Sequence, residues 1–204
     1  MSPERSRRRV RNGVFDLVAP FWDRLMGRWA VGDVLRALEL EPGLTVLDLA
    51  GGTGRLAHHL ATGGSRVILL DLSLPMVRRA ARRELATAQA RAESLPLPGN
   101  SLDRVVVVDA FHHMAHLEGV AREIARVLAP GGLAVLFEPD PESFIGGWVG
   151  RLERWTGFGS LLLPPREAAA LFREQGLEVE IRRASFHMLL TCRKARQTLR
   201  SEPG

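Results

Sequence analysis

Two carboxylates and a group of glycines are the residues of this chain whose types and spacing could do chemistry together. Asp48 lies near the end of a short apolar run, and three glycines follow it, at Gly51, Gly52 and Gly54. Because glycine has no Cβ, the backbone there can approach a ligand closely. Asp71 ends the next apolar run, where a carboxylate can accept hydrogen bonds from both hydroxyls of a ribose. The pairing predicts a site for a nucleotide-like cofactor.

Histidines that follow a later apolar run could move a proton. His112, His113 and His116 come shortly after the run 102–109, and histidine titrates near neutral pH. We expect His113 first and His112 second as a general base, if the substrate must lose a proton; structural capping is the alternative for each. Asp109 lies close by, but two adjacent histidines point apart, so no metal site is expected.

Alternating strands and helices must position these residues. Continuous apolar runs predict buried strands, and amphipathic periods between them predict helices. This alternation requires a parallel sheet with helices on both faces. The expected strands are 45–49, 66–72, 89–92, 102–109 and 133–137, with helices near 56–63, 74–85 (capped by Ser73) and 117–128, and a break at 130–132 before the last strand. A helix at 164–175 and an antiparallel pair of strands, 177–183 and 186–191, close the chain.

Segments at both ends of this alternation have a different character. Residues 1–12 carry five arginines and little to bury, which is typical of a flexible or weakly ordered basic arm. Residues 14–38 predict two or three short helices, interrupted at Pro20, that either form a lid or cover the sheet edge. Residues 139–163 hold apolar side chains among glycines just after a strand end, where open α/β sheets bind ligands, so we expect a substrate cap.

We expect one domain, because the composition suits a single core. Of the 204 residues 46% are hydrophobic and 25% charged. The expected parts are an N-terminal arm with helices at 1–40, a cofactor-binding core at 44–138, the cap at 139–163, and a C-terminal helix with closing strands at 164–204.

Charge and cysteine content narrow the classes of partner. Lys194 is the only lysine, so arginine carries almost all the positive charge, and the pI is about 10.9. A bias spread over the whole chain points to genome composition or heat tolerance more than to nucleic acid, so no stable nucleic-acid partner is expected. Cys192 is the single cysteine, which excludes an intrachain disulfide. With no run of roughly 18 apolar residues and no signal-peptide core, we expect a cytoplasmic protein without a transmembrane segment.

Together these motifs resemble the class I S-adenosylmethionine-dependent methyltransferases, in particular the small-molecule group of the ubiquinone and menaquinone biosynthesis C-methyltransferases. Residues 46–54 are similar to the family's first motif, with Ala50 where the first glycine usually stands, a variant that the quinone enzymes share. Further matching stretches are 69–73 with Met76 (the ribose-binding motif), 92–97 (the loop flanking adenine), 126–132 (the turn before the fifth strand) and 14–20 (the opening segment of the quinone enzymes).

The resemblance implies an α/β fold, a Rossmann-like three-layer sandwich whose seven-stranded, mostly parallel sheet has an antiparallel last strand. It also implies S-adenosylmethionine as methyl donor and in-line transfer to a small, apolar or lipid-like molecule; a homodimer is a further expectation. Asp109 is expected near the amino group of the donor or near the acceptor. The residues expected to bind the donor are Asp48, Ala50, Gly51, Gly52, Gly54, Asp71, Leu72, Met76, Ala92, Glu93, Asp109 and Phe111.

Three departures from the quinone enzymes leave the acceptor and the methylated atom open. Arg91 stands where an acid is common, residues 110–114 lack the usual glycine and arginine-asparagine pair, and the C-terminal third follows a different pattern. One alternative is an RNA or protein methyltransferase recruited by the basic arm, although an Asn/Asp-Pro-Pro-aromatic motif is absent at 109–112. A non-catalytic cofactor-binding module or a nicotinamide protein is another, but here the acid precedes the glycines, unlike Gly-x-Gly-x-x-Gly.

Overall fold

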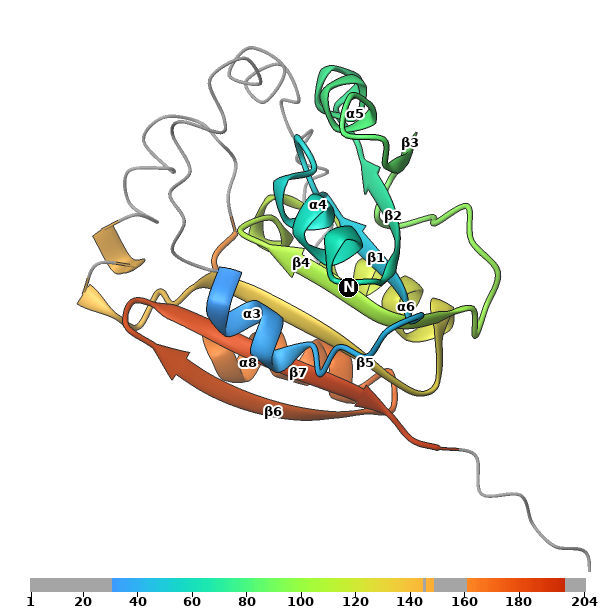
Figure 1. The fold of residues 1–204 in the computed structure, drawn as a ribbon. Coiled ribbons are helices and arrows are strands. Elements are labelled where there is room, and N and C mark those ends of the chain that lie inside the picture. Colours follow the sequence, from blue (N-terminus) through green and yellow to red (C-terminus); the bar gives the residue numbers. More distant parts are fainter. Residues whose placement is uncertain (1–30, 145, 149–160, 197–204) are drawn as a thin grey trace, which may run out of the picture.

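The computed structural model describes residues 31–144, 146–148 and 161–196, which form a twisted sheet with helices on both faces (Figure 1). The apolar runs become strands because a strand covered on both faces excludes most polar side chains. The strands are β1 (Thr45–Leu49), β2 (Arg66–Asp71), β3 (Ala86–Gln89), β4 (Leu102–Val108), β5 (Leu128–Pro139), β6 (Leu177–Ala184) and β7 (His187–Lys194).

The strands follow the order β3-β2-β1-β4-β5-β7-β6 across the sheet. Strand β1 pairs in parallel with β2 and β4, and β7 is antiparallel to both β5 and β6. The expected seven-stranded, mostly parallel sheet with an antiparallel last strand is confirmed. Because the order reverses between β1 and β4, the carboxyl ends of these two strands frame the crevice in which open α/β sheets bind ligands.

Two apolar clusters, one on each face, produce the three layers. The helices are α3 (Val31–Ala37), α4 (Arg55–Thr62), α5 (Leu74–Ala81), α6 (Leu117–Val127) and α8 (Pro165–Arg173), with a single 3₁₀ turn, η1 (Phe111–His113). Helices α3 and α4 share one cluster with Phe137 and Leu189 of the sheet, whereas α6 and α8 share the other with Leu136 and Met188. Side chains therefore alternate between the two faces along β5 and β7.

Some element boundaries differ from the sequence prediction. Helix α5 begins at its Ser73 cap, as predicted, but ends at Ala81, and Glu84 then adopts a φ of 60° in the turn that follows. The third strand consequently forms at Ala86–Gln89, in register with Ile68–Asp71, and the prediction of 89–92 was wrong by three residues. The expected break at 130–132 lies inside β5, as an irregularity in its pairing with β4.

Part of the predicted architecture lies outside the described residues. The basic arm, the helices predicted over 14–30 and residues 149–160 of the predicted cap belong there, and α3 is the described part of the N-terminal helical segment. Among the residues that the structure does describe, no helix is both long and apolar enough to cross a membrane.

Candidate active site

The turn after β1 is held in a conformation that favours glycine. Gly52 has a φ of 57° and Gly54 a φ of 77°, and Ala50 adopts the same left-handed region with a φ of 58°. A Cβ added at Gly51 would lie 2.6 Å from Cγ of Asp48 and 2.8 Å from Cδ1 of Leu69. Bulk at this position would therefore push against the acid that precedes the turn.

Asp48 is buried beneath this turn, at 2% exposure. Its Oδ2 accepts a hydrogen bond of 3.1 Å from the amide of Ala57 in α4. Burial raises the pKa of Asp48 to about 7, and the nearby Asp71 carboxylate adds to the rise, although the Ala57 amide opposes it. A positively charged ligand group beside Asp48 would favour its ionised form.

Asp71 lies at the end of β2, beside the glycine turn. Its Oδ2 accepts from the amide of Gly52 at 2.9 Å, and its Oδ1 accepts from the amide of Ser73 at 2.7 Å. Each carboxylate oxygen can accept more than one hydrogen bond. The partly exposed carboxylate is thus fixed by the backbone at the end of β2, where a ribose is predicted to bind.

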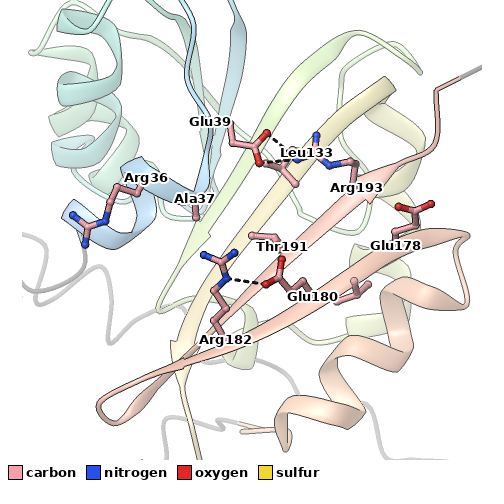
Figure 2. Close-up of a pocket in the computed structure, with 10 residues that line it drawn as sticks. Arg36, Ala37, Glu39, Leu133, Glu178, Glu180, Arg182, Thr191 and Arg193 are labelled. Carbon is pink, nitrogen blue, oxygen red and sulfur yellow. Dashed lines mark hydrogen bonds and ion pairs between the residues drawn. The ribbon is translucent and has the colours of Figure 1, made fainter.

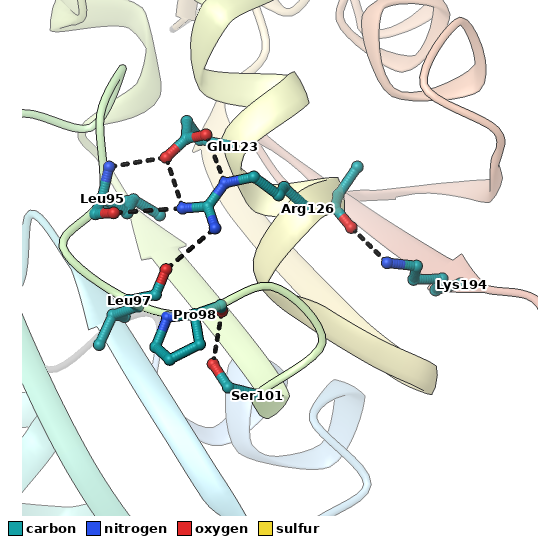
Figure 3. Close-up of polar contacts among 8 residues, drawn as sticks. Leu95, Leu97, Pro98, Ser101, Glu123, Arg126 and Lys194 are labelled. Carbon is teal, nitrogen blue, oxygen red and sulfur yellow. Dashed lines mark hydrogen bonds and ion pairs between the residues drawn. The ribbon is translucent and has the colours of Figure 1, made fainter.

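The loop after β3 is fastened to α6 by a network of hydrogen bonds (Figure 3). Glu123 accepts from the amide of Leu95 at 2.7 Å and from Nε of Arg126 at 2.7 Å. Arg126 also donates to the carbonyl groups of Leu95 and Leu97. The hydrogen bond from Arg126 lowers the pKa of Glu123, so the pair is charged at neutral pH. Ala92 and Glu93, both half-buried, lie in the same loop.

The remaining residues predicted around the adenine differ in exposure. Met76 is 2% exposed in the first turn of α5, and Leu72 is half-buried just before it. Phe111 is also 2% exposed, with its ring centroid 5.5 Å from that of Phe172 in α8. Met76 and Phe111 thus have core contacts whether or not they meet a ligand, and their role toward the donor stays a prediction.

Glu138, at the end of β5, organises the segment after β4. Its Oε1 accepts from the amides of Ala110 at 3.0 Å and Phe111 at 2.9 Å, and its Oε2 contacts Nδ1 of His112. Burial alone would raise the pKa of Glu138, but the attraction of His112 and these hydrogen bonds lower it overall. The side chains of His112 and Glu138 are 4% and 1% exposed. This arrangement supports the alternative considered for His112, a structural role.

The other histidines lie in varied surroundings. His113 is half-buried beside His112, with ring centroids 4.0 Å apart, and it stays a candidate base. His116 is exposed before α6, and His58 and His59 are exposed on α4. Among the described residues no three His, Cys, Asp or Glu side chains are grouped to hold a metal ion.

Two residues of the carboxyl edge were missed by the sequence reasoning. Glu138 was visible as an acid ending a strand, but its partners come from a segment 26 positions earlier. His187 begins β7 and has its Nε2 3.8 Å from Oδ1 of Asp109. A single histidine in a closing strand carries no spacing signal, so only the fold brings it to Asp109.

The described part of the predicted cap begins at the same edge (Figure 1). Asp140 donates its amide to the carbonyl of Phe186 at 2.9 Å, and its carboxylate lies 3.3 Å from Nε of Arg183, which also pairs with Glu142. Beyond this anchor, Phe144 and Trp148 are 83% and 60% exposed. The segment therefore leaves the sheet edge on a fixed base and carries large apolar side chains outward.

A polar hollow of about 330 Å³ lies elsewhere, between α3 and the β6–β7 pair (Figure 2). Arg193 donates to both carboxylate oxygens of Glu39 there, and Arg182 pairs with Glu180. Because β7 runs away from the carboxyl edge after His187, Thr191 and Arg193 lie toward the opposite end of the sheet. The hollow is thus separate from the predicted donor site.

Comparison with known proteins agrees with this geometry. Residues 47–136 match the methyltransferase domain family. The chain is 36% identical over 151 residues to the demethylmenaquinone methyltransferase of Thermus thermophilus, covering 65% of this chain and 68% of that one. It is also 36% identical over 103 residues to the corresponding protein of Corynebacterium urealyticum, covering 50% and 45%. The chain thus spans about half to two thirds of the length of these curated relatives.

A solved S-adenosylmethionine-dependent methyltransferase from Thermotoga maritima superimposes with a TM-score of 0.77 at 22% identity, covering 90% of this chain and 99% of that one. The chain therefore has the Rossmann-like fold of that methyltransferase. The chain belongs to the class I S-adenosylmethionine-dependent methyltransferases and resembles their quinone-methylating group.

Proposed function

We propose that this protein transfers the methyl group of S-adenosylmethionine to a small, apolar molecule of quinol type. The observation that carries the proposal is the pairing of the glycine turn with Asp71, whose carboxylate is fixed by the amides of Gly52 and Ser73. When bound, the donor supplies a methyl group on a positively charged sulfur, a leaving group that needs no activation. The protein's task is then to position the two reactants.

The residues around the turn fit the proposed donor. Asp48 and the amides of Gly51, Gly52 and Gly54 would hold the charged methionine end, and Asp71 the ribose. Leu72, Met76, Ala92, Glu93 and Phe111 would surround the adenine, and Glu123 with Arg126 would keep their loop in place. Asp109, at the end of β4, would face the methionine end or the acceptor.

The proposed acceptor class rests on the relatives and on the cap. Both curated relatives are named for methylation of demethylmenaquinone. The exposed Phe144 and Trp148 beside the sheet edge would suit an apolar acceptor. A homodimer is part of the same proposal, since an apolar cap exposed in one chain would be covered by a second copy.

Isothermal titration with S-adenosylhomocysteine, followed by transfer of labelled methyl from the donor to demethylmenaquinol, tests this function. We expect saturable binding, and we expect Asp71→Ala to weaken it by about tenfold or more, the cost of roughly 1.4 kcal/mol of lost hydrogen bonding. Asp33→Ala, which removes a carboxylate half-exposed on α3, is the matched control and should bind normally. Absence of binding by the unaltered chain would overturn the proposal.

A further inference from the structure

A histidine and a carboxylate meet at the carboxyl edge of the sheet, on the face that α3 and α4 cover. His187 opens β7 and pairs in register with Pro139 of β5. By strand alternation its side chain lies on the same face as Leu189, which packs in the cluster of α3 and α4. From there its Nε2 lies 3.8 Å from Oδ1 of Asp109.

Two aromatic rings fix the orientation of this imidazole. Phe137 stacks on it with ring centroids 4.4 Å apart and an interplanar angle of 29°. Phe186 approaches it at 4.0 Å and 39°. The ring is therefore held, while the side chains of His187 and Asp109 keep 11% and 25% exposure. Both side chains of the pair are thus more exposed at the sheet edge than that of His112, which is 4% exposed.

We propose that His187 is the proton acceptor of the methyl-transfer reaction and that Asp109 stabilises its protonated form. The inference rests on the proposed function, because it assigns a catalytic residue to that same site. His112 and His113 keep the contacts described above, and the role of general base is assigned to His187 in β7.

An acceptor that bears a hydroxyl gives up its proton to His187. The O–H bond breaks, the proton moves to Nε2 of His187, and the electron pair stays on the acceptor. An electron pair of the acceptor forms the bond to the methyl carbon, and the carbon–sulfur bond breaks with its pair left on sulfur. Methylation at a ring carbon also releases the proton of that carbon to water, after which His187 returns its own proton to the oxygen. One proton leaves in total.

The charged surroundings of His187 suit a base. Asp109 faces it from the position just after β4, and Glu138 acts on it from β5, although Glu138 contacts His112 directly. Arg183 of β6, which is in register with Met188 of β7, is paired with Asp140 and Glu142. Burial lowers the pKa of His187, against the smaller opposing effect of Glu138. The imidazole is thus neutral at neutral pH and able to accept a proton, and Oδ1 of Asp109 lies 3.8 Å from its Nε2.

His187→Gln in the full chain tests the assignment, with His59→Gln, an exposed histidine of α4, as the matched control. We expect His187→Gln to bind S-adenosylhomocysteine within about twofold of the unaltered protein and to lower kcat toward demethylmenaquinol by about 100-fold. The unaltered protein should lose kcat as the pH falls through the lowered pKa of His187, and the variant should lack this acid limb. A kcat within about threefold, or an unchanged acid limb, would overturn the proposal.

A second measurement needs no turnover. In the ligand-free protein, the imidazole signals of His187 should titrate below 6.5 in an NMR pH series, and Asp109→Asn should lower that pKa further because a stabilising charge is lost. An unchanged midpoint in Asp109→Asn would count against the pair even if methyl transfer is observed. If instead the unaltered protein binds no S-adenosylhomocysteine, the proposed function fails, and with it the catalytic assignment, whatever the NMR series gives.

Discussion

The carboxyl edge of the sheet is built in two different ways on its two sides. After β1 lies the proposed donor site, here called the donor side, which consists mainly of backbone conformation, with left-handed residues at 50, 52 and 54. After β4 and β5 lies the proposed acceptor site, the acceptor side, which consists of side chains from distant segments, in which Glu138 accepts from Ala110, Phe111 and His112. A nucleotide-like donor needs a fixed local turn, whereas an acceptor site can be assembled from whatever the strand ends bring together.

The buried carboxylates on the two sides have pKa values shifted in opposite directions. Asp48 is buried and its carboxylate accepts a hydrogen bond from the amide of Ala57, and burial raises its pKa to about 7. Glu138 is equally buried but meets an imidazole and several amides, and its pKa is lowered. The difference shows that burial alone does not set the charge of a carboxylate here, because the attraction of His112, followed by the hydrogen bonds from His112 and the two amides, outweighs burial at Glu138.

Among the substitutions that test this difference, removal of Glu138 should have the largest effect on stability. In Glu138→Ala the amides of Ala110 and Phe111 and the buried ring of His112 lose their hydrogen-bond acceptor. We therefore expect the free energy of unfolding to fall by about 3–5 kcal/mol. Urea unfolding followed by circular dichroism measures it. Glu142→Ala, whose exposed ion pair with Arg183 is worth about 1 kcal/mol or less, is the control. Equal losses in the two variants would show that Glu138 does not hold the acceptor side.

The pH dependence of stability should have a component from Asp48. Its folded pKa of about 7 lies above the ordinary value of 3.8, so the folded state binds more protons between these values and stability falls as the pH rises through them. The full effect is on the order of 4 kcal/mol. The lowered pKa of His187 has the opposite effect, because it makes stability rise as the pH rises through that pKa. The contribution of Asp48 is therefore measured as a difference in stability between a variant and the unaltered protein.

Asp48→Asn isolates this component, because an amide oxygen can still accept from Ala57 but does not ionise. The difference in unfolding free energy between variant and unaltered protein should grow in favour of the variant from about pH 4 to about pH 7. Glu41→Gln, an exposed loop position, should follow the unaltered protein throughout. A difference that stays constant with pH would mean that Asp48 is already ionised in the folded protein.

Gly51→Ala should weaken donor binding on the backbone-built side. The added Cβ would meet Cγ of Asp48 at 2.6 Å, so the acid or the turn must shift. We expect at least a tenfold loss of affinity for S-adenosylhomocysteine in calorimetry, about 1.4 kcal/mol. Gly63→Ala is the matched control, because Gly63 has a φ of −79° and its Cβ would lie 3.4 Å from the nearest atom. Normal binding by Gly51→Ala would show that donor binding does not require a close approach to the backbone at position 51.

The local structure of the proposed donor side was largely predictable from the sequence because its signals are local. The acid, the glycines and Asp71 lie within one strand-turn-helix-strand unit, and the Ser73 cap precedes its helix directly. Apolar runs likewise predicted the strands, since burial on both faces leaves a continuous pattern. The third strand was misplaced because 86–92 alternates small and polar residues without a distinct boundary, and only pairing with β2 fixes its register.

The acceptor side could not be predicted in the same way. His113 and, after it, His112 were predicted as a base because their type and position suit that chemistry, but the sequence did not show that Glu138 contacts His112. His187 was passed over because nothing near it in the sequence marks it, and its partner Asp109 is 78 positions away. Side-chain contacts between strand ends depend on strand order and register, which composition and periodicity do not specify.

Ala50→Gly should give the smallest effect and probes the strain stored in the donor turn. Alanine at a φ of 58° costs roughly 1–2 kcal/mol, and glycine removes this cost but adds about 0.5–1 kcal/mol of unfolded-state entropy. We expect a gain of up to about 1 kcal/mol in urea unfolding. Ala170→Gly, within α8, should instead lose about 1 kcal/mol. If both variants lose stability alike, Ala50 stores no strain, and the donor side depends on its glycines alone.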